Sequence, residues 1–244
     1  MASDHGGDDG WDRSAAAWIE EQGERGDYAR EFVLDPVMLG RIAGRGFKSA
    51  LDVGCGEGRF CRILRTHGIA ATGIDPTRAL LDRARQLDPQ GDYRAGVAEA
   101  MPFADAAFDL VVSYLTFIDI PDIAAAIAEM TRVLQPGGTL LVANLTSFNT
   151  AGIENGWIKD ASGKRLHYAI DHYLDERAPW VAWRGIRLRN WHRPLSTYMT
   201  LLIDRGLDLR FFAEPAPIAG PPERIDQHRR APYFMVMEWQ KPAA

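Results

Sequence analysis

Short apolar segments alternate along the middle of the chain with segments whose apolar residues recur at helical spacing. The short segments predict strands over 50–53, 71–74, 92–94, 109–113 and 139–144. The segments between them predict helices over about 58–67, 77–87 and 122–134, the last one ending at the turn Pro136-Gly137-Gly138. Such alternation is typical of a parallel sheet with helices on both faces.

The N-terminal part of the chain follows a different pattern. Residues 1–12 are polar and rich in Gly and Asp, which predicts a disordered tail. Residues 13–46 predict two or three helices, broken near Gly23 and Gly26.

The C-terminal part predicts the edge of the sheet. After a helix over 195–205, the segments 207–214 and 233–239 predict two antiparallel strands, because the Pro-rich loop between them shows no helical pattern. We therefore expect one α/β domain over 13–244, with a seven-stranded, mostly parallel sheet that contains one antiparallel strand.

Residues 145–192 form a long stretch without a regular pattern and hold four of the seven tryptophans. A connection of this length inside a compact domain is usually a lid or a binding loop. Alternation over 181–191 and 165–169 predicts a small antiparallel lid with a short helix between its strands. Its tryptophans would offer flat apolar walls to a bound molecule.

Composition limits the classes of function. Hydrophobic residues make up 46% and charged residues 25% of the chain, as in ordinary globular proteins, and no apolar run approaches the roughly 20 residues of a membrane helix. We see no secretory signal, and Cys55 and Cys61 are too close in sequence for a disulfide framework and lack metal-ligand spacing. A cytoplasmic location without a metal site is expected.

The distribution of charge disfavours nucleic acid as a partner. The formal net charge is −5, and 28 Lys and Arg are spread among 33 Asp and Glu, whereas nucleic-acid binders present a basic face. One region is locally basic and contains Lys159, Lys164, Arg165, Arg177, Arg184, Arg187, Arg189 and Arg193. Two interpretations stay open for it: a solvated surface, which is the commoner case, or a site for an anionic small molecule.

The strongest chemical signal is the sequence LDVGCGEGRF over residues 51–60. It predicts a strand, a tight turn and a helix start, where glycines let a ligand approach the backbone and free N–H groups lie nearby. The spacing G-x-G-x-G after Asp52 differs from the dinucleotide fingerprint, whose last glycine is replaced here by Arg59. A second acid, Asp75, follows the next predicted strand, where it can accept hydrogen bonds from both hydroxyls of a ribose.

Four segments within 50–144 together resemble the class I S-adenosylmethionine-dependent methyltransferases, especially the UbiE-like group: LDVGCGEGRF, GIDPT, AEAMPFADAAFDLVVS and RVLQPGGTLLVAN. The resemblance implies a Rossmann-like fold, S-adenosylmethionine as the methyl donor, and a small-molecule acceptor, aromatic or anionic. It implies that helices within 13–46 cover the donor and that 145–192 closes over the acceptor. Neither a nucleic-acid nor a membrane partner is expected, and a homodimer is left open.

The resemblance also implies a set of donor-binding residues: Tyr28, Arg30, Asp52, Gly54, Cys55, Gly56, Asp75, Pro76, Thr77, Ala98, Glu99, Ser113 and Tyr114. Among them, Arg30 would pair with the donor's carboxylate, unless it is an ordinary exposed helix residue. The family often has an Asp after the third strand that meets the adenine. Val97 stands at that position here, so backbone groups around Ala98 and Glu99 would hold the base.

Methyl transfer from a sulfonium depends mainly on alignment, and a base helps when the acceptor is a hydroxyl, a phenol or a protonated amine. The candidates are His192, Asp119, His167 and Tyr173. His192 is the first choice because its segment, NWHRPLS, resembles one that closes the acceptor pocket in some relatives, and the alternative is a helix cap. Asp119 equally suits a helix cap, and for the two lid residues a place on the surface or in ordinary aromatic packing is the commoner case.

Other functions stay open. One is methylation of RNA or protein, which the acidic balance and the lack of an appended binding domain disfavour. Another is a protein that binds the donor without transferring its methyl group. A nicotinamide oxidoreductase is disfavoured by Arg59.

Overall fold

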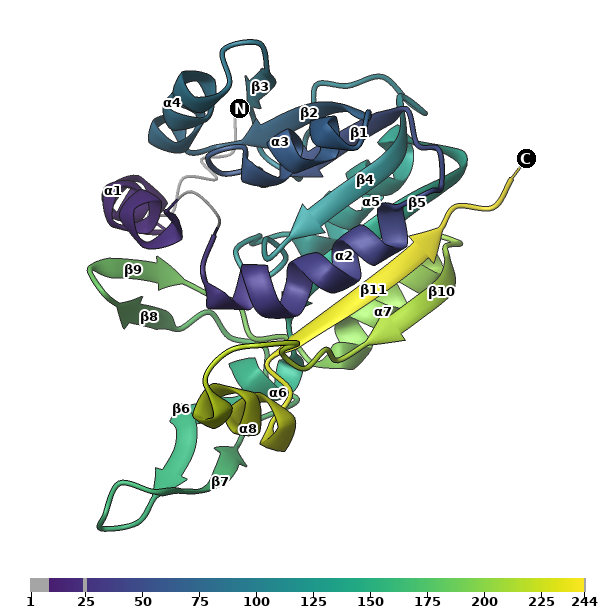
Figure 1. Cartoon of the computed structure of the whole chain (residues 1–244). Helices are drawn as coiled ribbons and strands as arrows, with labels where there is room; N and C mark the ends of the chain where they lie inside the picture. Colours follow the sequence, from purple (N-terminus) through teal and green to yellow (C-terminus); the bar gives the residue numbers. More distant parts are fainter. Residues whose placement is uncertain (1–8, 24–25, 244) are drawn as a thin grey trace, which may run out of the picture.

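A seven-stranded sheet in the order β10-β11-β5-β4-β1-β2-β3 forms the centre of the computed structural model, which describes residues 9–23 and 26–243 (Figure 1). Its strands are β1 (Ser49–Val53), β2 (Ala70–Asp75), β3 (Asp92–Ala95), β4 (Phe108–Tyr114), β5 (Leu134–Leu145), β10 (Asp208–Ala213) and β11 (Phe234–Gln240). β11 runs antiparallel to both β5 and β10, and the remaining pairs are parallel. The predicted mostly parallel sheet with one antiparallel strand is confirmed.

Helices cover both faces of this sheet (Figure 1). One face packs against α2 (Asp35–Ile42), α3 (Arg59–Thr66) and α4 (Arg78–Leu87), and the other against α5 (Ile123–Val133) and α7 (Leu195–Asp204). The central strands are therefore almost wholly buried, which explains their continuous apolar runs. The α/β, Rossmann-like fold class is confirmed, and no helix among the described residues is long and apolar enough to span a bilayer.

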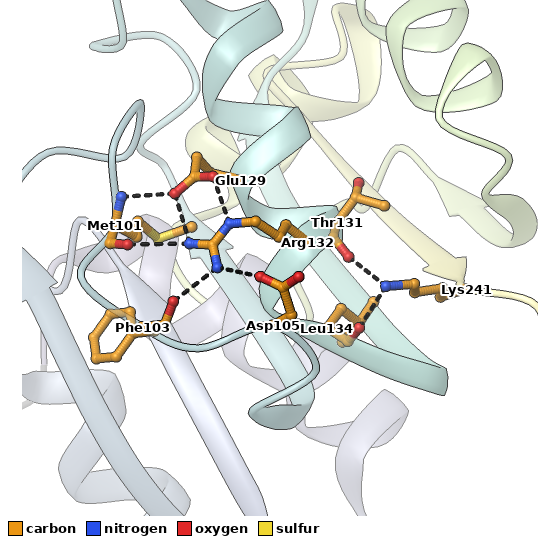
Figure 2. A network of polar contacts seen from close by, with 8 residues as sticks. All are labelled: Met101, Phe103, Asp105, Glu129, Thr131, Arg132, Leu134 and Lys241. Atoms are coloured by element: carbon orange, nitrogen blue, oxygen red, sulfur yellow. Dashed lines mark hydrogen bonds and ion pairs between the residues drawn. The ribbon is translucent and has the colours of Figure 1, made fainter.

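Arg132, at the end of α5, fixes the loop that leads from β3 to β4 (Figure 2). Its guanidinium donates to the carbonyl oxygens of Phe103 (2.7 Å) and Met101 (3.1 Å), and it pairs with Glu129 (2.7 Å). Lys241 donates to two carbonyl oxygens at the C-terminal end of the same helix, where a cation is favourable. These contacts thus fix the loop where it approaches the start of β4.

The insertion after β5 differs from its prediction. It contains α6 (Ser147–Thr150) and two separate hairpins, β6 (Gly152–Lys159) with β7 (Arg165–Ile170) and β8 (Trp180–Trp183) with β9 (Ile186–Arg189). A single lid with a helix between its strands is therefore wrong, because the helix precedes the first hairpin. The segment 181–191 is broken at Arg184 and Gly185, whose φ values of 44° and 80° form a two-residue hairpin turn.

Two further predictions need correction. The Pro-rich loop before β11 contains α8 (Pro222–Arg230), whose first-turn proline is favourable but which buries none of its residues and so shows no apolar periodicity. At the other end, α1 (Trp11–Gln22) begins inside the predicted tail, since its Ser14 and Ala15 are buried. Residues 1–8 of that tail lie outside the described part of the chain.

Candidate active site

A cavity of about 910 Å³ lies at the carboxyl ends of β1 to β4, the edge at which open α/β sheets bind ligands. Its volume is near the upper end of the roughly 300–1,000 Å³ that is usual for small-molecule sites. The turn after β1 and the ends of β2 and β3 form its floor, and the loop after β4 forms one wall. Trp11 and Trp18 of α1, with Arg30 of the short helix Arg30–Leu34, line it from the other side.

The glycine-rich turn brings the backbone directly to this cavity. Gly54 has a φ of +74°, and a Cβ at this position would lie 2.2 Å from the side chain of Thr116. The N–H groups of Gly54 and Cys55 donate to the carbonyl oxygen of Ile74, which ties the turn to the end of β2. Gly54, Cys55 and Gly56 all line the cavity, as predicted from the sequence.

Asp75 is the second fixed point of the floor. Its carboxylate accepts hydrogen bonds from the N–H groups of Gly56 and Thr77, each at 2.8 Å. Burial raises the pKa of Asp75, while these two N–H groups partly offset the rise. Each carboxylate oxygen keeps a further lone pair, so the residue suits the two hydroxyls of a ribose.

Asp52 is buried at the end of β1, with an exposed fraction of 1%. One oxygen accepts from the thiol of Cys61 at 3.5 Å, and Oδ1 has no hydrogen-bond partner among the described residues. Burial raises the pKa of Asp52 to about 7. An unpaired buried carboxylate is costly, and because this one lines the cavity, a cationic group of a ligand would satisfy it.

Arg30 also lines the cavity and is not an exposed helix residue, since its side chain is only 11% exposed. Its guanidinium pairs with Asp27 at 2.9 Å and lies 5.5 Å from the ring of Trp18 and 5.7 Å from that of Tyr114. A guanidinium held in this way suits a ligand carboxylate. Ammonium, carboxylate and ribose groups thus each find a matching residue, as the methyl donor S-adenosylmethionine requires.

Comparisons with known proteins agree with this site. Residues 51–142 match a family described as a methyltransferase domain. The chain is 33% identical over 171 residues to a malonyl-[acyl-carrier protein] O-methyltransferase of Serratia marcescens, across 70% of this chain and 62% of that protein. It is 26% identical, with a TM-score of 0.75, to the structure of an S-adenosylmethionine-dependent methyltransferase from Mesorhizobium loti, across 89% of this chain and all of that one.

Residues 51–142 thus match a methyltransferase domain, and the chain is similar over most of its length to an S-adenosylmethionine-dependent methyltransferase of known structure. The chain spans about 62% of the length of the malonyl-[acyl-carrier protein] relative just described. The fold alone is shared with the [4+2]-cyclase SpnF, which is 20% identical with a TM-score of 0.57, across 86% of this chain and 81% of that one. The narrower resemblance to the UbiE-like group stays a prediction.

The residues predicted to hold the adenine line the cavity. Pro76, Thr77, Ala98 and Glu99 line it, as does Val97, which replaces the family's Asp. Pro76 and Thr77 follow β2 and the other three follow β3, so the ends of neighbouring strands bring them together.

Two predicted donor-binding residues do not reach the cavity. Ser113 is fully buried on the α5–α7 face of the sheet, because neighbouring residues of a strand point to opposite faces and Tyr114 takes the cavity side. Tyr28 points away from Arg30, since residues two apart on a helix do not share a face. Its hydroxyl donates to the carbonyl oxygen of Ala219 at 3.0 Å.

Three of the four candidate bases lie away from the cavity. His192 is fully buried, and its two ring nitrogens bond to the hydroxyl of Thr150 (2.7 Å) and the carbonyl oxygen of Tyr173 (2.9 Å). Burial lowers the pKa of His192. His167 is exposed on the β6–β7 hairpin, and the hydroxyl of Tyr173 accepts from the N–H of Leu195. None of the three lines the cavity.

Asp119 is the candidate base that does line the cavity, and it does not cap α5, since Asp122 does. Its carboxylate accepts from the Nδ2 of Asn190 at 2.7 Å. Burial raises the pKa of Asp119 well above its usual range, and the charge of Asp9 adds to the rise. Among the described residues, no group of three or more His, Cys, Asp or Glu is arranged to hold a metal ion.

Arg193 explains why the HRPLS segment lies here. The side chain is 1% exposed and donates to the carbonyl oxygens of Phe117 (3.2 Å), Ile120 (2.7 Å) and Pro121 (2.8 Å). Its guanidinium also lies 4.5 Å from the ring of Trp191, which lines the cavity. The segment thus fixes the loop that carries Asp119 and does not supply the base.

Much of the cover of the cavity, the residues that line it opposite the floor, was not predicted from the sequence. Asp9, Trp11, Asp12 and Trp18 line the cavity from α1 and the residue pair before it. Of the four tryptophans of the insertion, Trp191 reaches the cavity and the other three do not line it. The spacing of Trp11, Ala15 and Trp18 is a helical signal, but the helices were predicted only from residue 13 onward, after the expected tail.

Proposed function

We propose that this chain transfers a methyl group from S-adenosylmethionine to a small-molecule acceptor bound in the same cavity. The observation that carries the proposal is Asp52, which lines the cavity and whose buried Oδ1 has no hydrogen-bond partner among the described residues. The donor's ammonium would satisfy it, Arg30 would hold the donor's carboxylate and Asp75 the ribose. When bound, the donor supplies a methyl group already activated on a sulfonium, so the chain mainly has to align the acceptor and exclude water.

The relatives do not identify the acceptor of this chain. One of them acts, by its name, on a malonyl group carried by a protein, and that acceptor is included in the test alongside free small molecules. The cytoplasmic location and the oligomeric state also stay predictions.

Donor turnover tests this function. The full chain is incubated with S-adenosylmethionine and pools of small molecules, with malonyl carrier protein as a separate arm, and S-adenosylhomocysteine is measured by mass spectrometry. At least one arm should produce it together with a methylated acceptor, and Asp75→Ala should abolish both. Donor binding without turnover in any arm would instead assign the chain to proteins that bind the donor without transfer.

A further inference from the structure

Five residues that line the cavity, outside the set that suits the donor, combine carboxylates with aromatic rings. This group, the acceptor end, consists of Asp9, Trp11, Asp12, Asp119 and Trp191. It lies next to the loop after β4, and its residues come from α1, from that loop and from the end of the insertion.

The carboxylates of the acceptor end are held in place. Asn190 bonds to Asp119, and the N–H of Trp191 donates to the carbonyl oxygen of Ile118 at 2.6 Å. Asp9 accepts from the N–H of Trp11 at 2.9 Å, and its carbonyl oxygen accepts from the N–H of Arg189 at 2.9 Å. These groups are therefore oriented before any acceptor binds.

Carboxyl groups outnumber guanidinium groups among the residues that line the cavity. Among the described residues that line it, eight carry carboxylates and two carry guanidinium groups. The two guanidinium groups already pair with carboxylates, Arg30 with Asp27 and Arg59 with Asp35. The donor groups assigned above use Asp52 and Asp75, which leaves Asp9, Asp12 and Asp119 as further carboxyl groups that line the cavity.

The basic residues of the insertion do not supply a site for an anion in this cavity. Arg177, Arg184, Arg187 and Arg189 do not line it. Arg187 instead covers the ring of Trp180 at 4.0 Å, and Arg184 pairs with Glu21 on α1. An acceptor with a carboxylate next to its reacting atom would meet like charges at the acceptor end without a compensating cation.

We propose that the acceptor is a cationic amine, held against the tryptophans and carboxylates of the acceptor end, and that Asp119 takes the proton lost by its nitrogen. This proposal rests on the proposed function. Indole faces attract cations, most strongly in desolvated sites. The nitrogen loses a proton to Asp119 and forms a bond to the methyl carbon, while the carbon–sulfur bond breaks and its electron pair stays on sulfur.

Asp119 has the properties that such a role needs. Burial, together with the facing charges of Asp9 and Asp75, raises the pKa of Asp119 and makes the carboxylate a stronger base than an exposed Asp. In the same site, a carboxylate acceptor would carry no proton to remove.

The test uses the full chain loaded with S-adenosylhomocysteine, whose own binding is measured first. Binding is compared within sets of ligands that share an aromatic ring and differ in the attached group, such as benzylamine, benzyl alcohol and benzoate. Saturation-transfer NMR detects binding, and calorimetric titration then measures the affinity. The affinity of each ligand is measured for the wild type, Asp119→Asn and Asp226→Asn. Asp119→Asn keeps the hydrogen bond from Asn190, and Asp226→Asn is a control on α8, exposed and outside the cavity. Turnover of any amine that binds is then followed against pH.

Amines should bind at least about tenfold more tightly than their matched carboxylates, and Asp119→Asn should reduce that ratio about tenfold while Asp226→Asn leaves it unchanged. Asp119→Asn should also remove the acidic limb of the pH profile. Tighter binding of carboxylates or of neutral alcohols, an unchanged ratio in Asp119→Asn, or no ligand binding to the loaded protein would overturn the proposal. Failure to bind S-adenosylhomocysteine at all would overturn the proposed function instead.

Discussion

The floor of the cavity is held by bonds between residues that are close in the chain, whereas its cover is held by bonds between residues far apart. In the floor, Gly56 donates to Asp75, 19 residues later, and both are buried in the turn region. In the cover, the hydroxyl of Ser14 accepts from the N–H of Arg187 (3.0 Å) and donates to its carbonyl oxygen (3.1 Å), although 173 residues separate them. A second contact of the cover, Arg184 with Glu21, has an arginine that is 64% exposed.

This difference separates two tasks. The floor matches the chemical groups of one molecule, whereas the cover rests on a few polar contacts between distant segments, so we expect the cover to open at a lower cost in free energy. Substitutions in the floor should therefore reduce donor binding strongly, and substitutions in the cover should mainly change how fast the cavity opens.

The largest effect is expected from Asp75→Ala. The change removes the acceptor for two backbone N–H groups and for the ribose, so donor affinity should fall about 100-fold or more. Calorimetric titration with S-adenosylhomocysteine measures this, with Asp226→Asn as the control. A loss of less than about threefold would show that Asp75 does not hold the donor.

Gly54→Ala and Gly68→Ala form a matched pair. Both glycines have a positive φ, +74° and +77°, but an added Cβ meets Thr116 at Gly54 and nothing within 4 Å at Gly68. Backbone strain of about 1–2 kcal/mol applies to both, and the clash should make Gly54→Ala cost about 1–3 kcal/mol more in free energy of unfolding. Denaturant titration gives the difference, and equal losses would mean that the floor tolerates a side chain at this point.

A third prediction concerns Asp52 and pH. Its pKa is raised by burial from an ordinary value of about 3.9 to about 7, so this carboxyl lowers the stability of the free protein as pH rises from about 4 to 7. A bound ammonium favours the ionised form. Donor affinity should therefore rise with pH between about 5 and 7, by at most about tenfold per unit, with proton release on binding.

Asp52→Asn is the control for this pH dependence. Asp75 and Asp119 also have raised pKa values and contribute in the same direction, so the quantity that counts is the difference between wild type and Asp52→Asn. Calorimetry in buffers of different ionisation enthalpy measures the protons released. Identical pH profiles of the two proteins would exclude Asp52 as the partner of the ammonium.

The smallest effect is expected in the cover. Ser14→Ala loses both hydrogen bonds to Arg187, which should cost about 1 kcal/mol. Amide hydrogen exchange in α1 should become about fivefold faster while exchange in β1 and β2 stays unchanged. If the floor accelerates as much as α1, the cover does not open as a separate unit.

The same contrast explains what could be predicted from the sequence. Glycines and acids at a fixed local spacing define the floor, and Asp52, Gly54, Gly56 and Asp75 all line the cavity. His192 was misassigned because no local sequence pattern shows that Thr150 and Tyr173 occupy its ring nitrogens. The role of Asp9 and Trp11 depends in the same way on distant contacts with β9.

Binding of the donor by the full chain tests the central claim most directly. Calorimetric titration with S-adenosylmethionine and S-adenosylhomocysteine, with NAD and the Asp75→Ala protein as controls, separates donor recognition from general nucleotide binding. The site described above predicts micromolar binding of both sulfur compounds, strong weakening by Asp75→Ala and no binding of NAD. A well-folded wild-type protein that binds neither sulfur compound, or that binds NAD equally well, would contradict it.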